Sequence, residues 1–550
     1  MKLSLILTIA TLLIFASCGK KEAGATNFAK DLKDPQKQGK ALIELEKLGP
    51  KAKSAIPQLM SLLEEDDKRL AKDALRVIVK VGEAKDIVAA AKVGVKSKNR
   101  SVTTLSINSL KKLENKTPEV LEIIVGAIDS TEMFTREAGI IAAGELKIKT
   151  AVPSLIKVLV NTSETQNIIL NKQAARSLGQ IGDEKAITPL IKGLFIRKQV
   201  KKKNGKDIGG KTSFVFARNA LVSFGKAGLK VVLTTIDGKN EDFNNFKKAN
   251  PNIKSADINY NLLVMINELG DESVFPILIK YMNDKDLGIR LLAEAGMGGL
   301  GIKKAVPVLV KKYAKLKRAI VKKSQQDPKL VEDLKELQNI NRMLAMIGGK
   351  ASEKHLVSEM TGKPLKIEGE EFDELKNDAR SSFSNFASAK YYKTYQKIWA
   401  SQKSVEGKMG ALLHLKIMEV ADKCKEDVKC YGEMFDKKKN PKLRGKALKA
   451  LGKELGGIGM AKSLPVFKRQ KATYMLANFN TPEAKKILLE KALFDKDPGV
   501  RGAGAYSLER IGTKTDVPAL EEVIKKAKKK SYLKKARSLY SKLLAKLKNK

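Results

Sequence analysis

The sequence predicts an all-α fold, an α-solenoid of stacked helix pairs, and three observations support this prediction. A chain of 550 residues is too long for one compact core, so it forms either several domains or a repeat array. The segments at Arg290 and Arg501 share one spacing, in which Gly follows after 11 residues and Pro after 17. Arg136 and Pro153 repeat the longer spacing. Between these markers Ala and Leu recur at helical intervals.

Each repeat has the signals of two consecutive helices. An Asp caps the first helix, Gly ends it, and Pro stands in the first turn of the second helix. Small residues such as Ala503 and Ala505 permit close approach of neighbouring helices. One helix pair cannot bury its own apolar face, so the pairs are expected to stack into a right-handed superhelix with a long concave surface. That surface is the default binding site.

The segment NKQAARSLGQIGDEKAITPLIKGL at 171–194 is similar to HEAT repeats, in particular to their short bacterial form of the phycobilisome-lyase type. Weaker copies lie at 39–65, 66–94, 101–129, 213–236, 258–284 and 441–456. The resemblance implies the solenoid fold and leaves the function open. It also raises one enzymatic alternative, a bilin-lyase-like activity, which would require a chromophore partner.

The chain is expected to divide into five parts. These are a lipoprotein signal peptide (1–17), a flexible tether (18–30), an N-terminal array (31–350), an irregular helical segment with a loop (351–400) and a C-terminal array that ends in a basic cap helix (401–550). Three stretches interrupt the repeat pattern and are expected to project as loops: 197–211, 237–256 and 361–378.

The N-terminus has the features of an export signal. Lys2 is followed by an apolar run from Leu3 to Phe15, which is too short to cross a bilayer. The tetrapeptide that ends at Cys18, FASC, resembles the lipobox of bacterial lipoproteins, although Phe15 stands where that family usually has Leu. The resemblance implies cleavage before Cys18 and a lipid on its sulfur. Ordinary cleavage nearby or an uncleaved anchor is the alternative.

A lipid on Cys18 would place the protein in the bacterial cell envelope, facing the periplasm or the exterior. By resemblance, Gly19 after the cysteine favours the outer membrane over the inner one. Acyl chains together with the nearby Lys20 and Lys21 satisfy the two-signal requirement for stable anchoring. The membrane is therefore one expected partner.

Cys424 and Cys430 form an even pair in a chain that is expected to be exported, which predicts a disulfide. In one straight helix two residues six apart are separated by about 9 Å along the axis. The segment CKEDVKC is therefore expected at a helix end and turn, where the two sulfurs can meet. Free thiols are the alternative. Two cysteines without neighbouring His make a poor metal site, and we expect neither a metal nor a cofactor.

The formal net charge is +45, from 106 basic and 61 acidic side chains, and it would concentrate polyanions near the surface. An anionic envelope polymer is thus an alternative ligand, whereas export argues against nucleic acid. A solvated basic surface is the simpler explanation of the charge, because most of it is Lys spread along the chain. The candidate contacts are two lysine clusters: Lys201, Lys202, Lys203, and Lys528, Lys529, Lys530.

A stripe of aromatic residues is the second candidate contact. Its members are spaced by four and would share one face of a single helix: Phe383, Ala387, Tyr391, Tyr395 and Trp399. Tyr391, Tyr395 and Trp399 could contact a partner. Packing between irregular repeats is the alternative.

The sequence offers little for catalysis. His355 and His414 stand alone, each followed by Leu, and His414 is expected in the core. The string GKDIGGKT at 205–212 fits the spacing of a phosphate-binding loop, but a charged run precedes it where a buried strand is required. The leading hypothesis is therefore a non-enzymatic, membrane-anchored scaffold that binds proteins.

Overall fold

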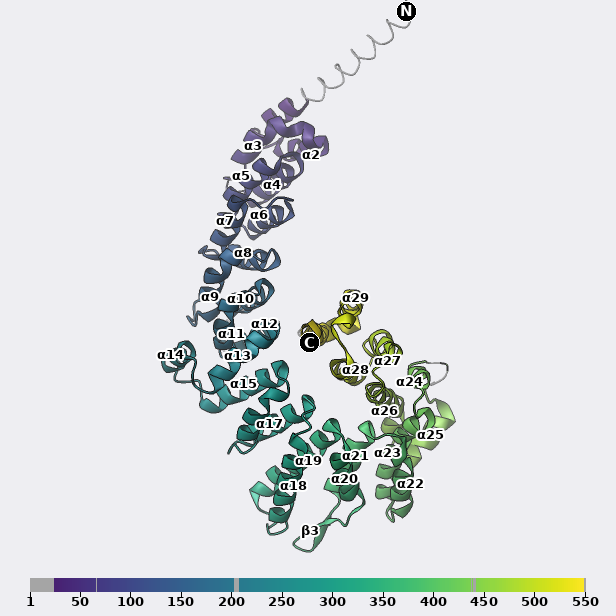
Figure 1. Ribbon diagram of the computed structural model, residues 1–550. Helices are drawn as coiled ribbons and strands as arrows, with labels where there is room; N and C mark the ends of the chain where they lie inside the picture. The colour runs from purple at the N-terminus through teal and green to yellow at the C-terminus, as the bar shows by residue number, and fades with distance from the viewer. Residues whose placement is uncertain (1–23, 66, 202–206, 437, 439–441, 549–550) are drawn as a thin grey trace, which may run out of the picture. The chain divides into compact units, whose positions relative to one another are not determined.

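The computed structural model describes residues 24–65, 67–201, 207–436, 438 and 442–548, and it confirms the all-α solenoid (Figure 1). The predicted signal peptide (1–17) and Cys18 lie outside these residues. The chain divides into two compact units, unit 1 (Met1–Leu221) and unit 2 (Val222–Lys550), and we describe each by itself. None of the described helices combines the length and the apolar character needed to cross a membrane.

Unit 1 is built from two layers of helices (Figure 1). The first layer consists of α2 (Gln38–Leu48), α4 (Lys68–Val81), α6 (Arg100–Lys112), α8 (Met133–Glu145), α10 (Ile168–Ile181) and α12 (Phe214–Val222). The second layer consists of α3 (Ile56–Ser61), α5 (Ala84–Gly94), α7 (Pro118–Ile128), α9 (Val152–Val160) and α11 (Ile187–Gly193).

Caps and small residues explain why these segments form closely packed helices. The carboxylate of Asp67 accepts hydrogen bonds from the first free N–H groups of α4, and Gly182 ends α10 in the left-handed region at φ 74°. Helices α8 and α10 approach closely at Gly144, where an added Cβ would lie 2.5 Å from Ser177 Oγ. Ser177 Oγ donates to the carbonyl of Ile140 at 2.7 Å, which fixes the register of the two helices.

The array begins earlier than the sequence predicts. Residues 24–31 are helical, although the segment 18–30 was expected to be a flexible tether. Ala25, Ala29 and Leu32 are buried in one core cluster with Leu42 and Leu45. The Gly/Ala-rich composition suggested a linker, but these small residues pack against α2 and its neighbours.

The three predicted loops contain regular structure. Strands β1 (Arg197–Lys201) and β2 (Asp207–Thr212) form an antiparallel hairpin, as do β3 (Leu365–Ile367) and β4 (Glu370–Phe372). The stretch 237–256 contains helix α14 (Glu241–Ala249). Each element interrupts the helical pattern, which is why the repeat spacing is lost there.

Unit 2 continues the same architecture. Successive helices of one layer contact each other: α13 (Gly225–Ile236), α15 (Ser255–Leu269), α17 (Leu287–Gly299), α19 (Pro328–Ile347), α21 (Glu374–Phe386), α23 (Val405–Cys424), α26 (Ile458–Leu476), α28 (Pro498–Ile511) and α30 (Arg537–Lys548). The remaining helices cover this layer: α16 (Phe275–Tyr281), α18 (Ala305–Ile320), α20 (Lys350–Thr361), α22 (Tyr392–Ser401), α24 (Val428–Glu433), α25 (Gly445–Glu454), α27 (Pro482–Ile487) and α29 (Val517–Lys528).

Two contacts within unit 2 join helices that are far apart in sequence. Lys542 Nζ of α30 pairs with Glu268 Oε1 of α15 at 2.7 Å, although 274 residues separate them. The hydroxyl of Tyr506 in α28 donates to the carbonyl of Met346 in α19 at 3.4 Å. Side chains of α15, α19, α28 and α30 are thus engaged in contacts within unit 2.

Candidate functional site

The arginines that mark the repeat have a structural role. Arg290 Nη1 donates to the carbonyls of Asp284 and Lys285, at 3.1 and 3.0 Å. Arg501 Nη1 donates to the carbonyls of Asp495 and Lys496, both at 2.8 Å. These carbonyls belong to the loop just before each helix, so the arginine satisfies acceptors that lie outside the regular helical hydrogen bonding. The recurring spacing is therefore explained by folding.

The aromatic stripe does not lie on one helix. Helix α21 ends at Phe386, a 3₁₀ turn covers Ala389–Tyr391, and α22 begins at Tyr392. Tyr395 is buried, and its hydroxyl donates to the carbonyl of Arg380 at 2.8 Å. The hydroxyl of Tyr391 donates to Glu353 Oε2 at 2.5 Å. Trp399 is 39% exposed and is the member of the stripe that remains available to a partner.

The two lysine clusters have different outcomes. Lys201 ends β1, while Lys202 and Lys203 lie outside the described residues. Lys528, Lys529 and Lys530 are exposed around the end of α29. Lys530 Nζ lies 4.9 Å from the centre of the Phe494 ring. Cations at this end of a helix also offset its partial negative charge.

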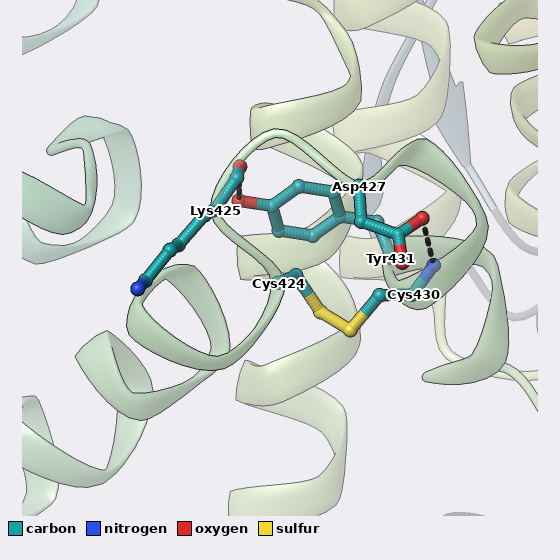
Figure 2. The surroundings of a disulfide bond; sticks show 5 residues. All are labelled: Cys424, Lys425, Asp427, Cys430 and Tyr431. Carbon is teal, nitrogen blue, oxygen red and sulfur yellow. Dashed lines mark hydrogen bonds between the residues drawn. A yellow bond between two sulfur atoms is a disulfide. The ribbon is translucent and has the colours of Figure 1, made fainter.

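The cysteine pair lies at a helix end and turn, as the spacing predicts. Cys424 ends α23 and Cys430 belongs to α24, with Cα atoms 5.3 Å apart and a disulfide between the sulfurs (Figure 2). Asp427 caps α24 by accepting the N–H of Cys430 at 3.0 Å, and the hydroxyl of Tyr431 donates to the carbonyl of Lys425 at 2.8 Å. Formation of the bond in solution stays a prediction.

Neither the phosphate-loop match nor His414 forms a reactive site. Residues 207–212 of the match are an antiparallel strand, whereas a phosphate-binding loop follows a buried parallel strand. Burial lowers the pKa of His414 to about 4. Its Nδ1 lies 3.4 Å from Ser384 Oγ.

The interior of unit 2 contains a buried ion network that the sequence pattern did not reveal. Glu294 of α17 and Glu336 of α19 are 0% and 1% exposed, and both carboxylates pair with Lys312 of α18. Arg290 Nε donates to Glu336 at 2.9 Å, and Asn339 Nδ2 donates to Glu294 at 2.8 Å. Burial raises the pKa of Glu294 to about 7, against the opposing effect of Lys312.

A second polar cluster adjoins this network along α18–α21. His355 Nε2 lies 3.1 Å from Asn341 Oδ1, and the rings of His355 and Tyr313 meet edge to face at 4.6 Å. Burial lowers the pKa of His355, raises that of Tyr313, and raises that of Asp378 to about 6. Lys317 pairs with Glu359 beside them at 2.6 Å. Together with the ion network, these groups link five successive helices, α17 to α21.

Lys471 of α26 is fully buried without a carboxylate partner in the described part of the chain. Its Nζ donates to the carbonyls of Asn385 and Ala387, at the C-terminal end of α21. Burial lowers the pKa of Lys471 well below its usual range. Its hydrogen bonds to these carbonyls hold α26 against the end of α21.

Sequence reasoning missed these interior groups because their partners come from different helices. The available signal was a single acid within an apolar helix, as Glu294 in LLAEAGMGG. The side chains are enclosed, so an external substrate does not reach them. The interior of unit 2 is therefore better suited to holding helices together than to chemistry on a ligand.

One cavity of about 180 Å³ lies at the junction of α15, α28 and α30. Two of its lining residues, Glu268 and Lys542, are paired with each other. Tyr506, Leu539 and Leu543 supply aromatic and aliphatic surface. Its lining combines apolar groups with charges that already have partners.

The first layer of unit 1 exposes a set of side chains that we call the first-turn strip. Its members lie in the first turns of five successive helices, α4 to α12: Arg69, Arg100, Phe134, Ile169 and Val215. Phe134 and Ile169 are each 39% exposed and Val215 is 53% exposed. Sequence reasoning could have found this strip by aligning the residues that follow each helix cap.

Comparison with known proteins supports the repeat assignment. A model of HEAT repeats matches residues 466–539, and a model of the PBS lyase HEAT-like repeat matches residues 172–195. No curated protein sequence matches the chain.

Several solved structures are similar in fold at low identity. The karyopherin Kap121p bound to Pho4p is 15% identical with a TM-score of 0.44, over 92% of this chain and 55% of that one. Importin beta is 12% identical with a TM-score of 0.40, over 90% and 72%. The CpcE and CpcF complex of phycocyanin lyase from Nostoc is 15% identical with a TM-score of 0.22, over 56% and 97%.

The chain thus spans little more than half of the karyopherin chain it is compared with, and none of these structures is similar enough to carry an argument about function. The two matching segments belong to different units, and each coincides with helices of the two-layer array. The chain is an α-solenoid in which residues 172–195 and 466–539 match HEAT-type repeats.

Proposed function

We propose that this protein is a non-enzymatic scaffold, anchored by a lipid on Cys18 to a membrane of the bacterial cell envelope, that binds other proteins through its helical array. The observation that carries the proposal is the exposed first-turn strip on a layer of regularly stacked helices. Exposed apolar side chains in a row favour a macromolecular partner over a small ligand. The FASC sequence supports the lipid anchor.

The distance between anchor and array adds a physical constraint. The first described helical residue is Gly24, so only residues 19–23 separate it from Cys18. Five residues span about 17 Å at most. In this proposal the array is held close to the membrane surface, and Lys20 and Lys21 lie within reach of anionic headgroups.

The absence of catalysis is part of the same proposal. The groups with the most perturbed pKa values, Glu294 and Lys471 among them, are enclosed between helices and engaged in structural contacts. Perturbed groups at an active site would instead face a cleft. Turnover of a substrate, or pigment that copurifies with the protein, would contradict this part and favour the lyase-like alternative.

The anchor is tested by metabolic labelling with a clickable fatty acid, followed by mass analysis of the membrane-extracted protein. We expect label on the wild type and none on Cys18→Ser. Pull-down from envelope extracts with the wild-type chain should then recover a specific protein. Labelling of Cys18→Ser, or recovery of nothing beyond a control solenoid, would overturn the corresponding part of the proposal.

Binding of an anionic envelope polymer is a second candidate function. It is favoured by Lys528, Lys529 and Lys530, which are exposed and have no ion pair with any described residue. Several other C-terminal lysines are already paired, as Lys542 is with Glu268 and Lys548 with Glu521. The expected result is binding of lipopolysaccharide that weakens steeply with salt and is lost when the three lysines become Gln.

A further inference from the structure

The helices that carry the first-turn strip run side by side in the same direction. Thr135 Oγ1 of α8 donates to Thr103 Oγ1 of α6 at 3.5 Å, so the first turns of these helices meet. Asn167 caps α10 through Oδ1, and its Nδ2 lies 3.8 Å from the sulfur of Met133, the first residue of α8. The exposed side chains of neighbouring first turns are therefore adjacent in space.

Three cations contact aromatic rings instead of carboxylates: Arg100, which belongs to the strip, and Lys172 and Arg176, which follow Ile169 along α10. The Arg100 guanidinium lies 4.6 Å from the centre of the Phe134 ring. Arg176 and Lys172 of α10 lie 5.2 and 5.9 Å from the Phe216 ring of α12. Within the described residues, none of these three cations pairs with an acidic side chain. Elsewhere on the same layer the opposite occurs, as Arg76 pairs with Glu46 and Asp73.

A partner for this surface needs negative charge and apolar side chains together. Carboxylates would neutralise Arg100, Lys172 and Arg176, which contact rings and pair with no acidic side chain of the described residues. Apolar side chains would cover the exposed Ile169 and Val215. Nucleic acid fits less well, because aliphatic residues offer no stacking surface for bases.

The spacing of the helices defines the spacing in the partner. Adjacent packed helices lie about 8–10 Å apart, and an extended chain in the polyproline II conformation advances about 3.1 Å per residue and returns to the same face at every third residue. One repeat of the strip therefore corresponds to about three residues of an extended segment. We propose that the first-turn strip of unit 1 binds an extended acidic protein segment with an apolar side chain at about every third position. This inference rests on the proposed scaffold function and names the chemistry of its partner.

The test uses the full chain in detergent and fluorescent 15-residue peptides, measured by fluorescence anisotropy. The first peptide repeats Phe-Glu-Asp, the second has the same composition with the Phe residues clustered, and the third replaces the acids by Lys. A DNA oligonucleotide of similar charge is the fourth probe. We expect the periodic acidic peptide to bind about ten-fold tighter than the clustered peptide, and the basic peptide not to bind. Equal affinity for both acidic peptides, or tighter binding of DNA, would overturn the inference.

Charge reversal locates the binding on the strip. R100E/R176E should lower the affinity for the periodic peptide by about ten-fold or more, because two attractive contacts become repulsive. The matched control is K149E/K185E, which changes the same net charge at two exposed lysines outside the strip. It should change the affinity by less than about two-fold. An equal effect of both double variants would show general electrostatics only and would contradict the site.

A folding control and a pull-down separate the possible failures. Unchanged circular dichroism and melting temperature of R100E/R176E exclude a folding defect, and F134S provides an uncharged second variant if the reversal does not fold. If wild type and R100E/R176E recover the same envelope protein equally, the scaffold function stands and the strip is not its site. If the periodic peptide binds but the wild type recovers no protein, the scaffold function is wrong. The proposed preference of the first-turn strip for a periodic acidic segment then still stands.

Discussion

The interiors of the two units differ in the polar groups that they bury. Unit 1 buries hydroxyl and amide side chains that bond to backbone carbonyls, as Ser177 does with Ile140 and Asn171 with Leu159. All fully enclosed charged side chains of the described residues are in unit 2, with Glu294, Glu336 and Lys471 as examples. Neutral groups tolerate the loss of one partner, whereas a buried charge depends on its partner. The regular unit can therefore vary its interior, while unit 2 depends on specific pairs.

The largest expected effect comes from removing the shared cation of unit 2. Lys312→Met leaves Glu294 and Glu336 buried with less compensation, and we expect a loss of about 3–5 kcal/mol in the free energy of unfolding. Trp399 is the only tryptophan and lies in unit 2, so its fluorescence during urea unfolding reports this unit. The matched control is the exposed neighbour Lys311→Met, which should stay within about 0.5 kcal/mol. If both variants lost the same free energy of unfolding, the buried charges of unit 2 would not depend on Lys312 as proposed.

A pH dependence should come from Asp378, whose pKa burial raises from 3.8 to about 6. The folded state then binds the proton more tightly than the unfolded state does. The stabilisation is complete below about pH 4 and is lost as the pH rises through 6, by about 2–3 kcal/mol. Asp378→Asn lacks this titration, so the stability of the wild type relative to this variant should fall by that amount between pH 4 and pH 7. His355, with its lowered pKa, has the opposite slope and cancels in this difference. A difference that stays constant from pH 4 to 7 would contradict the burial effect.

The disulfide is expected to have an intermediate effect, again in unit 2. Cys424→Ser/Cys430→Ser removes a bridge that closes a short loop, and we expect a loss of about 2 kcal/mol. Intact mass before and after alkylation under denaturing conditions shows whether the thiols are oxidised. Reductant should lower the melting temperature of the wild type and leave the double variant unchanged. Alkylation of both cysteines without reductant would show free thiols.

The smallest effect concerns the close packing in unit 1. Gly144→Ala places a methyl group against Ser177 and should cost about 1–2 kcal/mol. Gly126, in helix α7, has open space at the same position, so Gly126→Ala should be neutral or stabilise by up to about 1 kcal/mol. Thermal unfolding followed by hydrogen exchange in α7 and α8 compares the two. A destabilising Gly126→Ala would mean that packing does not distinguish these sites.

The sequence predicted the fold well because the same repeat pattern occurs at several places in the chain. The offset from Arg290 to Pro307 recurs from Arg501 to Pro518, and the structure explains the arginines by their bonds to carbonyls of the loop before each helix. The aromatic stripe was predicted less well, since spacing by four indicates one face only while the helix continues. The helix in fact stops after Phe386.

Interior charges and the strip could not be predicted in the same way. Lys312 pairs with acids 18 residues before it and 24 residues after it, and each of these acids lies on another helix. The contact of Arg100 with Phe134 likewise requires that two helices lie side by side. Such pairs follow from the packing of helices and have no local signature.

The pairing of Glu268 with Lys542 bears on the order in which the protein folds. In a simple array each helix finds its neighbours soon after it is synthesised. Glu268 obtains this partner only after 274 further residues have been made. The contacts of α15 are therefore completed late. A chain shortened before α30 would lack this contact, so it would be altered near its middle as well as at its end. Faster hydrogen exchange in α15 of such a shortened chain would show that the stability of α15 depends on α30.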